Sequence, residues 1–272
     1  MALPRQVLTI SSQVAAGPVG NSAIAPALLA MGVTPVAVST IILSNHPGHG
    51  TPEGMAMPAD KLALMLERIV TLGFLRDDAV VLTGYFANEE QIEAVASFLR
   101  ARPRSHYLCD PVLGDTHRGL YVAQSVACAI RDRLVPLADS LAPNAFELAW
   151  LTGQDVHDGE SARAASRTLS GKWVVVTSIP EGEKLTTAVF EHNHATAVTR
   201  PKLPDVPHGT GDLFSGLLAA RLALGHSLDD SLGFAVAATE HVIAVSAGTA
   251  SLDLAAGLKN IASVQAFAAS HE

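Results

Sequence analysis

Short apolar runs that alternate with segments of helical spacing constrain the fold of this chain more than any other feature. The runs 79–82 and 173–176 consist entirely of apolar residues, and 7–10 is interrupted only by Thr9. Such runs are typical of strands buried on both faces, because an exposed face would place a polar residue at every second position. Helical segments between buried strands favour parallel pairing with helices on both sides of the sheet. The sequence therefore predicts an α/β fold with a mainly parallel sheet.

The same patterns give an expected order of strands and helices. Expected strands lie at 7–10, 34–40, 79–82, 106–109, 140–142 and 173–176, with a hairpin of 185–190 and 196–199 around His192-Asn193-His194. Expected helices lie at about 24–31, 58–72, 88–102, 123–133, 144–152, 161–169, 213–224, 228–245 and 254–267. A chain of 272 residues with 49% hydrophobic positions can bury one large core, so we expect a single domain over 1–272.

The overall charge and the cysteines exclude several classes of protein. A formal charge of −8 without clustered Lys and Arg argues against a nucleic-acid partner, because a phosphate backbone is bound by clustered cations. Cys109 and Cys128 lack Cys-x-x-Cys spacing, which favours free thiols over a zinc site or a disulfide framework. No leader pattern follows Met1, and no apolar run approaches the roughly 20 residues that cross a bilayer. We therefore expect a soluble cytoplasmic protein without a membrane partner.

A glycine-rich turn in the C-terminal third gives the first indication of chemistry. Gly209, Thr210 and Gly211 precede Asp212, and helical spacing begins at Leu213. The glycines permit a tight turn whose N–H groups face outward at the positive end of the following helix, which suits a phosphate group. A carboxylate beside a phosphate is repulsive unless it has a second task, such as accepting the proton of an attacking hydroxyl. The alternative is that Thr210 or Asp212 only caps the helix.

Polar residues that follow the predicted strands form a second group. Ser12 and Tyr85 each follow a strand, and loops at the carboxyl ends of parallel strands line the binding crevice. A long polar loop at 44–54 contains His46 and His49. We interpret these histidines as loop contacts to a substrate rather than as a metal pair, because no third ligand of suitable type stands near them. Ser12 can also be an ordinary turn hydroxyl.

Oxygen-bearing side chains occur as two closely spaced pairs. Asp110 and Asp115 follow the strand 106–109, and carboxylates so placed suit Mg²⁺ or its bound waters, although aspartates also form turns. Asn144 and Glu147 share one face of the first turn of a predicted helix. They either form a capping box or supply oxygen atoms to a metal ion and a phosphate.

Taken together, these motifs resemble the ribokinase-like superfamily and, within it, the pyridoxal kinases. The resemblance covers nearly the whole chain. Its most specific motifs, in chain order, are Ser12-Gln13-Val14 with Gly17-Pro18-Val19-Gly20-Asn21, Ser44-Asn45-His46, Cys109-Asp110-Pro111-Val112 with Gly114-Asp115, Pro143-Asn144 with Glu147, and Gly209-Thr210-Gly211-Asp212. The resemblance implies a ribokinase-like three-layer α/β/α sandwich with a mostly parallel central sheet. It also implies transfer of the γ-phosphoryl group of ATP to the 5′-hydroxyl of pyridoxal, pyridoxine or pyridoxamine.

The resemblance further implies a role for each motif. Asp212 would be the catalytic base, and N–H groups from Gly209 to Gly211 would stabilise the transferred phosphoryl group. The substrate ring would contact Ser12, Val19, His46, Pro47 and Tyr85; the nucleotide would contact Asp110, Asp115, Asn144, Glu147, Thr177, Ser178, Thr210 and Gly211; and Mg²⁺ would lie near Asp115 and Glu147. Such kinases often also use K⁺ and form homodimers.

Two positions depart from the family pattern. Many pyridoxal kinases have a threonine where this chain has Pro47, so we expect the loop to grip the ring less specifically. Ala142 lacks the hydroxyl often found there, which weakens a monovalent-ion site at that position. Two other functions stay open: a hydroxymethylpyrimidine kinase of the same superfamily, and a vitamin B6 carrier or sensor. Asp212 speaks against a carrier, because a pure binder gains nothing from a carboxylate beside a phosphate.

Overall fold

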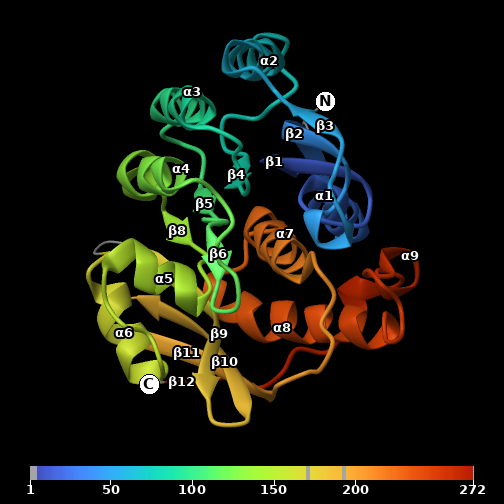
Figure 1. Cartoon of the computed structure of the whole chain (residues 1–272), viewed down its shortest axis with the longest axis vertical. Coiled ribbons are helices and arrows are strands. Elements are labelled where there is room, and N and C mark those ends of the chain that lie inside the picture. The colour runs from blue at the N-terminus through green and yellow to red at the C-terminus, as the bar shows by residue number, and fades with distance from the viewer. Residues whose placement is uncertain (1–4, 170–171, 192–193, 272) are drawn as a thin grey trace.

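A ten-stranded sheet runs through the molecule in the order β12-β11-β10-β9-β8-β5-β4-β1-β2-β3 (Figure 1). The computed structural model describes residues 5–169, 172–191 and 194–271. The strands are β1 (Gln6–Ala16), β2 (Thr34–Asn45), β3 (Gly54–Ala56), β4 (Val80–Thr83), β5 (Tyr107–Cys109), β8 (Ser140–Leu141), β9 (Trp173–Glu181), β10 (Lys184–Glu191), β11 (His194–Pro201) and β12 (Ser270–His271). All ladders from β2 through the centre to β9 are parallel, and those at both edges are antiparallel. The predicted mostly parallel sheet is therefore confirmed.

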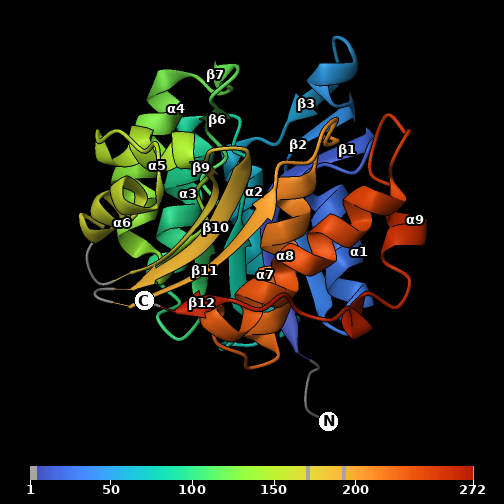
Figure 2. The ribbon, with the colours of Figure 1, turned by 90° about the horizontal axis from the view of Figure 1, so that it is seen from below.

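Helices cover both faces of this sheet, which makes the predicted three-layer α/β/α sandwich (Figures 1 and 2). One layer contains α2 (Ala59–Thr71), α3 (Glu89–Arg100), α4 (Gln124–Ala129), α5 (Ala145–Thr152) and α6 (Gly159–Arg167). The other contains α1 (Asn21–Ala30), α7 (Thr210–Ala223) and α8 (Leu228–Val245), with the short α9 (Leu254–Gly257) beside α8. None of the helices within the described residues is both long and apolar enough to cross a membrane.

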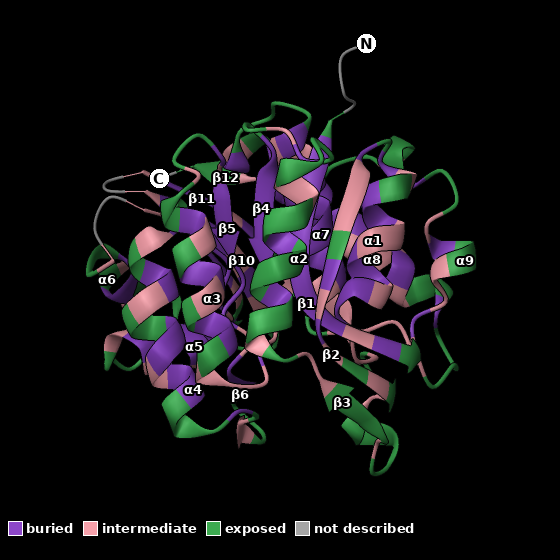
Figure 3. Cartoon of the chain, turned by 90° about the horizontal axis from the view of Figure 1, so that it is seen from above, coloured by how far each residue is buried: buried purple, intermediate pink, exposed green. Residues whose placement is uncertain are grey.

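The core consists of two apolar clusters, one on each face of the sheet. Successive side chains of β1 point to opposite faces, so Leu8 packs with the layer of α2 and α3 while Val7 packs with α1 and α7. Both side chains are completely buried. Figure 3 shows the central strands buried between helices whose outer faces are exposed. This two-sided burial is why the apolar runs of the sequence lack alternation.

Helix α7 is buried along most of its length, because it lies between the sheet, α1 and α8. Gly216 permits this packing: a Cβ atom there would lie 3.2 Å from the Cα atom of Ile24 in α1. The turn that precedes α7 is consequently carried by one of the most constrained elements of the fold.

Three predicted elements have other bounds in the structure. Strand β1 continues to Ala16 instead of ending at Ile10, because β2 extends alongside it and supplies a pairing partner. The hairpin of β10 and β11 is confirmed by its antiparallel register, while its turn at His192-Asn193 lies outside the described residues. The predicted helix 123–133 begins as α4 and continues as a wider π turn over Ile130–Leu134.

The predicted helix at 254–267 is wrong. Helix α9 ends at Gly257, and Asn260 then adopts a left-handed backbone with φ of 59°. The rest of the tail crosses α8, where the N–H of Phe267 donates to the carbonyl of Gly233 at 3.1 Å, and the tail then pairs with β11 as β12. Apolar spacing suggested a helix, but backbone hydrogen bonds to α8 and β11 hold the end of the tail in an extended form.

Candidate active site

The glycine turn begins α7 in the conformation that an anion site requires. Gly209 is the N-cap residue with φ of 93°, and its carbonyl accepts the N–H of Leu213 at 2.9 Å. A Cβ atom at Gly209 would lie 2.0 Å from the carbonyl oxygen of Pro18, so only glycine fits. The capping position is thus Gly209 and not Thr210 or Asp212. The N–H groups of the first turn have no partner within the helix and point out of its positive end.

Asp212 lies in this first turn of α7 and is half-buried. Burial raises the pKa of its carboxyl group to about 6, and the backbone N–H of Gly20, which donates to the carboxylate, opposes that rise. A carboxylate with this pKa is ionised near neutral pH yet retains an appreciable affinity for a proton. Both properties suit a general base.

The loop after β1 forms the wall next to Asp212. Gly20 has a positive φ of 59°, and a Cβ atom there would lie 2.3 Å from both the carbonyl oxygen and the Oγ atom of Ser12. Ser12 is buried inside the extended β1 rather than in a loop. Val19, which precedes Gly20, is half-buried. Ser12, Gly20 and Asp212 therefore form a continuous surface at the start of α7.

Asp110, directly after β5, is held by a residue of α7. The hydroxyl of Ser215 donates to the Oδ2 atom of Asp110 at 2.6 Å, and both residues are buried. Burial, together with the negative charges of Glu147 and Asp212, raises the pKa of Asp110 well above its usual range. A buried group of carboxylates that oppose one another's ionisation favours a cation nearby.

Asn144 and Glu147 form a complete capping box at the start of α5. The Asn144 side chain accepts the N–H of Glu147 at 3.0 Å, and Glu147 Oε2 accepts the N–H of Asn144 at 2.8 Å. Glu147 Oε1 also accepts the N–H groups of Leu113 and Gly114, at 2.9 and 3.3 Å. Burial raises the pKa of Glu147 to about 7, although these hydrogen bonds oppose that rise. The capping-box alternative thus describes the geometry of this pair, and a metal role for Glu147 stays a prediction.

Asp115 belongs to a small hairpin of β6 (Gly114–Asp115) and β7 (Gly119–Leu120). Its Oδ1 atom accepts the N–H groups of His117 and Arg118, each at 2.8 Å, and the Tyr121 hydroxyl donates to Oδ2. These bonds lower the pKa of the Asp115 carboxyl group, against the opposing effect of burial. Across the described residues, no three His, Cys, Asp or Glu side chains converge as a metal site would require.

The remaining predicted nucleotide and substrate residues lie at the same edge of the sheet. The N–H of Tyr85 donates to Ser11 Oγ at 3.2 Å, which holds Tyr85 close to β1 and to Ser12. Thr177 pairs with Asn144 through an isolated parallel bridge. The adjacent Ser178 is exposed and has a positive φ of 59°. The carboxyl end of the sheet therefore gathers residues from five parallel strands or the loops after them.

A cluster of three histidines was not foreseen from the sequence. The rings of His46 and His208 lie 4.2 Å apart between centroids, and His49 lies 6.2 and 6.0 Å from them. Burial and the neighbouring cations lower the pKa of His46 to about 4, and the same effects lower the pKa of His208. In the sequence, His46 and His49 have no third candidate metal ligand near them. His208 belongs to the glycine turn, and only the fold brings it to the loop.

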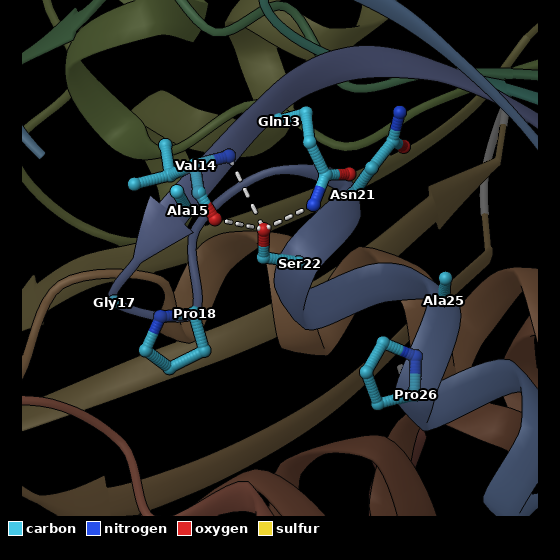
Figure 4. A pocket seen from close by; sticks show the side chains of 9 residues that line it. All are labelled: Gln13, Val14, Ala15, Gly17, Pro18, Asn21, Ser22, Ala25 and Pro26. Carbon is cyan, nitrogen blue, oxygen red and sulfur yellow. Dashed lines mark hydrogen bonds between the residues drawn. The ribbon is translucent and has the colours of Figure 1, made fainter. Parts of the chain in front are cut away.

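A hollow of about 470 Å³ opens on the other side of the loop after β1 (Figure 4). The Ser22 hydroxyl there accepts from Gln13 Nε2 at 2.8 Å and donates to the carbonyl of Val14 at 2.6 Å. The lining residues are Gln13, Val14, Ala15, Gly17, Pro18, Asn21, Ser22, Ala25 and Pro26. None of the predicted substrate or nucleotide residues is among them, although Pro18 also approaches Gly209.

Comparison of the sequence with known families gives a match over most of the chain. The pattern of the phosphomethylpyrimidine kinase family matches residues 26–257. The chain is 37% identical over 241 residues to the pyridoxine/pyridoxal/pyridoxamine kinase of Bordetella bronchiseptica, a match that covers 84% of this chain and 85% of that protein.

Solved structures are similar over the full length. The pyridoxal kinase of Leishmania donovani in complex with ADP and pyridoxine is 27% identical with a TM-score of 0.90, covering 98% of this chain and 99% of that one. The pyridoxal kinase of Entamoeba histolytica has a TM-score of 0.92 at 24% identity and covers 99% of this chain and 100% of that one. At 24% identity, the similarity to the Entamoeba kinase shows the fold alone.

Proposed function

The chain belongs to the phosphomethylpyrimidine kinase family of the ribokinase-like superfamily, and from this premise we propose that it is an ATP-dependent pyridoxal kinase. It transfers the γ-phosphoryl group of ATP to the 5′-hydroxyl of pyridoxal, pyridoxine or pyridoxamine. The product from pyridoxal is pyridoxal 5′-phosphate, which places the enzyme in vitamin B6 salvage. Relatives at this level of identity act on these three vitamers by name, and the related Leishmania structure holds ADP with pyridoxine.

The observation that carries this proposal is the position of Asp212 in the first turn of α7. A base with a pKa of about 6 lies beside a turn whose N–H groups are free to bind an anion. Asp212 would accept the proton of the 5′-hydroxyl as its oxygen attacks the phosphorus atom. The N–H groups from Gly209 to Gly211 would stabilise the charge that spreads over the transferred group. In-line transfer needs mainly such positioning and charge stabilisation.

The buried carboxylates support a site for Mg²⁺ with the nucleotide. Asp110, Glu147 and Asp212 lie close enough that the first has its pKa raised by the other two. A divalent cation would relieve this repulsion, and Mg²⁺ in such sites uses one or two carboxylates together with phosphate oxygens and water. When bound, the ion neutralises phosphate charge. We propose that Asp115, in the β6–β7 hairpin, and Glu147, in the first turn of α5, would hold the ion, with Asp110 as a neighbouring carboxylate.

The nucleotide and the vitamer would occupy opposite ends of the crevice. Asn144, Thr177 and Ser178 lie together at the end formed by β9 and α5 and would contact the nucleotide. The vitamer ring would lie at the β1 end, against a set of residues drawn from β1, the loop after it, the 44–54 loop and the end of β4. These residues are Ser12, Val19, His46, Pro47 and Tyr85. Asp212 would act on the vitamer hydroxyl where the two ligands meet.

An ADP-release assay tests the activity directly. We expect turnover with the three B6 vitamers and much less with hydroxymethylpyrimidine. That second alcohol tests the alternative function, which the family name itself raises. Turnover with the pyrimidine alone would replace the proposal by that alternative. Tight vitamer binding without ADP release would indicate a carrier.

Pro47 gives a prediction about specificity. A pocket that hydrogen-bonds a polar group strongly rejects analogues that lack it, whereas an apolar contact discriminates only modestly. Because Pro47 has no donor, we expect similar kcat/KM values for the three vitamers, and we expect Pro47→Thr to favour one of them. The same assay measures these ratios. Strong selectivity in the wild type that Pro47→Thr leaves unchanged would assign recognition to Ser12 or Tyr85.

Glu147 gives a prediction about the metal. Glu147→Gln removes one charged oxygen, so we expect a higher Mg²⁺ concentration for half-maximal rate. It also sets an amide against backbone N–H groups, which costs about 1–3 kcal/mol of stability. Asp158→Asn is the control, because Asp158 belongs to a second capping box, at the exposed start of α6. A lower Tm with an unchanged Mg²⁺ profile, as in the control, would leave Glu147 a capping role only.

The resemblance extends the proposal to a K⁺ requirement, a homodimer and a cytoplasmic location. Exposed apolar side chains at the sheet edge support an assembly between two copies: Ile42 on β2 is 46% exposed and Met55 on β3 is 64% exposed. An open edge strand with such side chains pairs readily with another chain. Sedimentation of the purified protein distinguishes the dimer from a monomer.

A further inference from the structure

The loop between β2 and β3 contacts the glycine turn through one residue. The rings of His46, in the loop, and His208, directly before Gly209, lie 4.2 Å apart and are tilted by 35°. Gly48 lies against the same ring, since a Cβ atom there would lie 2.6 Å from His208 Nε2. The loop therefore fits closely over His208, and a side chain at 48 would require the ring of His208 or of His46 to shift.

The loop is organised before it makes this contact. His46 Nδ1 accepts the N–H of Gly48 at 3.1 Å, which caps the single 3₁₀ turn Pro47–His49. Asn45 Nδ2 donates to the carbonyls of His46 and Gly50, at 3.1 and 3.0 Å. These bonds make the loop a compact unit, so a contact at one point fixes the position of the whole turn. Figure 2 shows this loop rising from the same end of the molecule as the β6–β7 hairpin.

His208 is covalently joined to the other half of the site. Its neighbour Gly209 is fixed by φ of 93° and by the close approach of Pro18. Helix α7, which carries Asp212, is buried against α1 and α8. The His208 side chain is therefore fixed relative to Asp212, and a loop that packs against this side chain is fixed relative to Asp212 as well.

We propose that His208 is a positioning residue that holds the loop of residues 46–50 against the glycine turn and thereby fixes a substrate alcohol under the loop relative to Asp212. The inference rests on the proposed kinase function for its substrate. Its mechanical part, the attachment of the loop to the turn, does not depend on that function. His208 contributes through its ring and takes no part in proton transfer.

The charges around the cluster are consistent with a contact between neutral rings. His46 Nδ1 must be unprotonated to accept the N–H of Gly48. His49, Arg118 and Asp115 also act on the cluster: the first two oppose protonation of His208, and Asp115 favours it. The pKa values of His46 and His208 are accordingly lowered. The two tilted rings therefore contact each other as uncharged groups near neutral pH.

Steady-state kinetics of three variants test the positioning role. We expect His208→Ala to lower kcat/KM for the vitamer about 10²-fold, the loss that follows a displacement of about 1 Å, with KM for ATP unchanged. His208→Phe keeps an aromatic ring at this position and should therefore retain most of the wild-type kcat/KM. His226→Ala is the control, because this exposed histidine lies at the far end of α7. Equal losses for Ala and Phe, or a parallel rise in KM for ATP, would contradict the proposal.

Gly48 supplies an independent second measurement. Gly48→Ala inserts a methyl group between the loop and His208, so it should also lower kcat/KM for the vitamer. The double variant Gly48→Ala/His208→Ala should lose less than the product of the two single losses, because both changes break one contact. Multiplicative losses would show that the two residues act separately and would overturn the inference.

Hydrogen exchange of the unliganded protein separates this inference from the proposed function. We expect amides of the 44–54 segment to exchange faster in His208→Ala than in the wild type, and at the wild-type rate in His226→Ala. This result requires no substrate. Faster exchange in a protein that phosphorylates no vitamer would contradict the function and retain the attachment. Unchanged exchange in an active kinase would contradict the attachment alone.

Discussion

Asp212→Asn should lower kcat by about 10² to 10⁴-fold, the range observed when a general base is lost. The amide is nearly the same size as the carboxylate and can still accept the N–H of Gly20, so the turn should keep its shape. What it loses is the ability to take up a proton. Burial raises the pKa of Asp212 to about 6, so the wild-type rate should be present above that pH and should fall as the pH drops through it.

Rapid kinetics and nucleotide binding check this result together. ATP binding measured by calorimetry should remain close to that of the wild type, because the N–H groups that we propose for phosphate binding are unchanged. Asp60→Asn, a change of the same type on the exposed start of α2, serves as the control. Retention of near-wild-type kcat by Asp212→Asn would remove Asp212 from the role of base and leave the turn as a binding element only.

The sheet was predictable because its signal is local. A strand buried on both faces must be apolar at every position, as 79–82 and 173–176 are, and no tertiary information is needed to recognise it. The glycine turn is equally local: Gly209 adopts the positive φ that its residue type permits. The resemblance to a family then ordered the polar loops, and sequence and structural relatives agree with the family.

Contacts between distant segments were not predictable in the same way. Nothing near His46 in the sequence indicates His208, because the two residues lie 162 positions apart along the chain. Only the fold places their rings 4.2 Å apart. The tail after Gly257 has helical spacing but is held extended by α8 and β11. Ser12 was expected in a loop, yet β2 extends far enough to keep it within β1. In each case a partner from elsewhere decides the local structure.

Glu147 shows how a local alternative can be correct in geometry and still leave function open. The sequence allowed a capping box or an oxygen donor, and the capping box is present. The same carboxylate also receives N–H groups from Leu113 and Gly114, which join α5 to the β6–β7 hairpin. A single buried acid thus holds together α5 and the β6–β7 hairpin, and its charge raises the pKa of Asp110.

Gly209→Ala should nearly abolish activity while leaving the rest of the fold intact. The new Cβ atom would lie 2.0 Å from the backbone oxygen of Pro18, a contact that no side-chain movement can relieve. The φ of 93° adds the cost of a left-handed backbone, about 1–2 kcal/mol for a residue other than glycine. The turn must therefore move away from the loop after β1, and its N–H groups move with it. We expect kcat/KM to fall by at least about 10²-fold, as for a misplaced catalytic group.

Two glycines of the same helix separate strain from steric exclusion. Gly225 follows the far end of α7 with φ of 91°, and a Cβ atom there meets nothing within 4 Å. Gly225→Ala should thus lower the Tm through backbone strain alone, without a comparable loss of activity. Gly211→Ala adds a methyl group in open space with an ordinary backbone, and it should cost less activity than Gly209→Ala. If Gly225→Ala and Gly209→Ala reduced activity equally, loss of stability would explain both. The contact between Gly209 and Pro18 would then have no separate part in shaping the anion site.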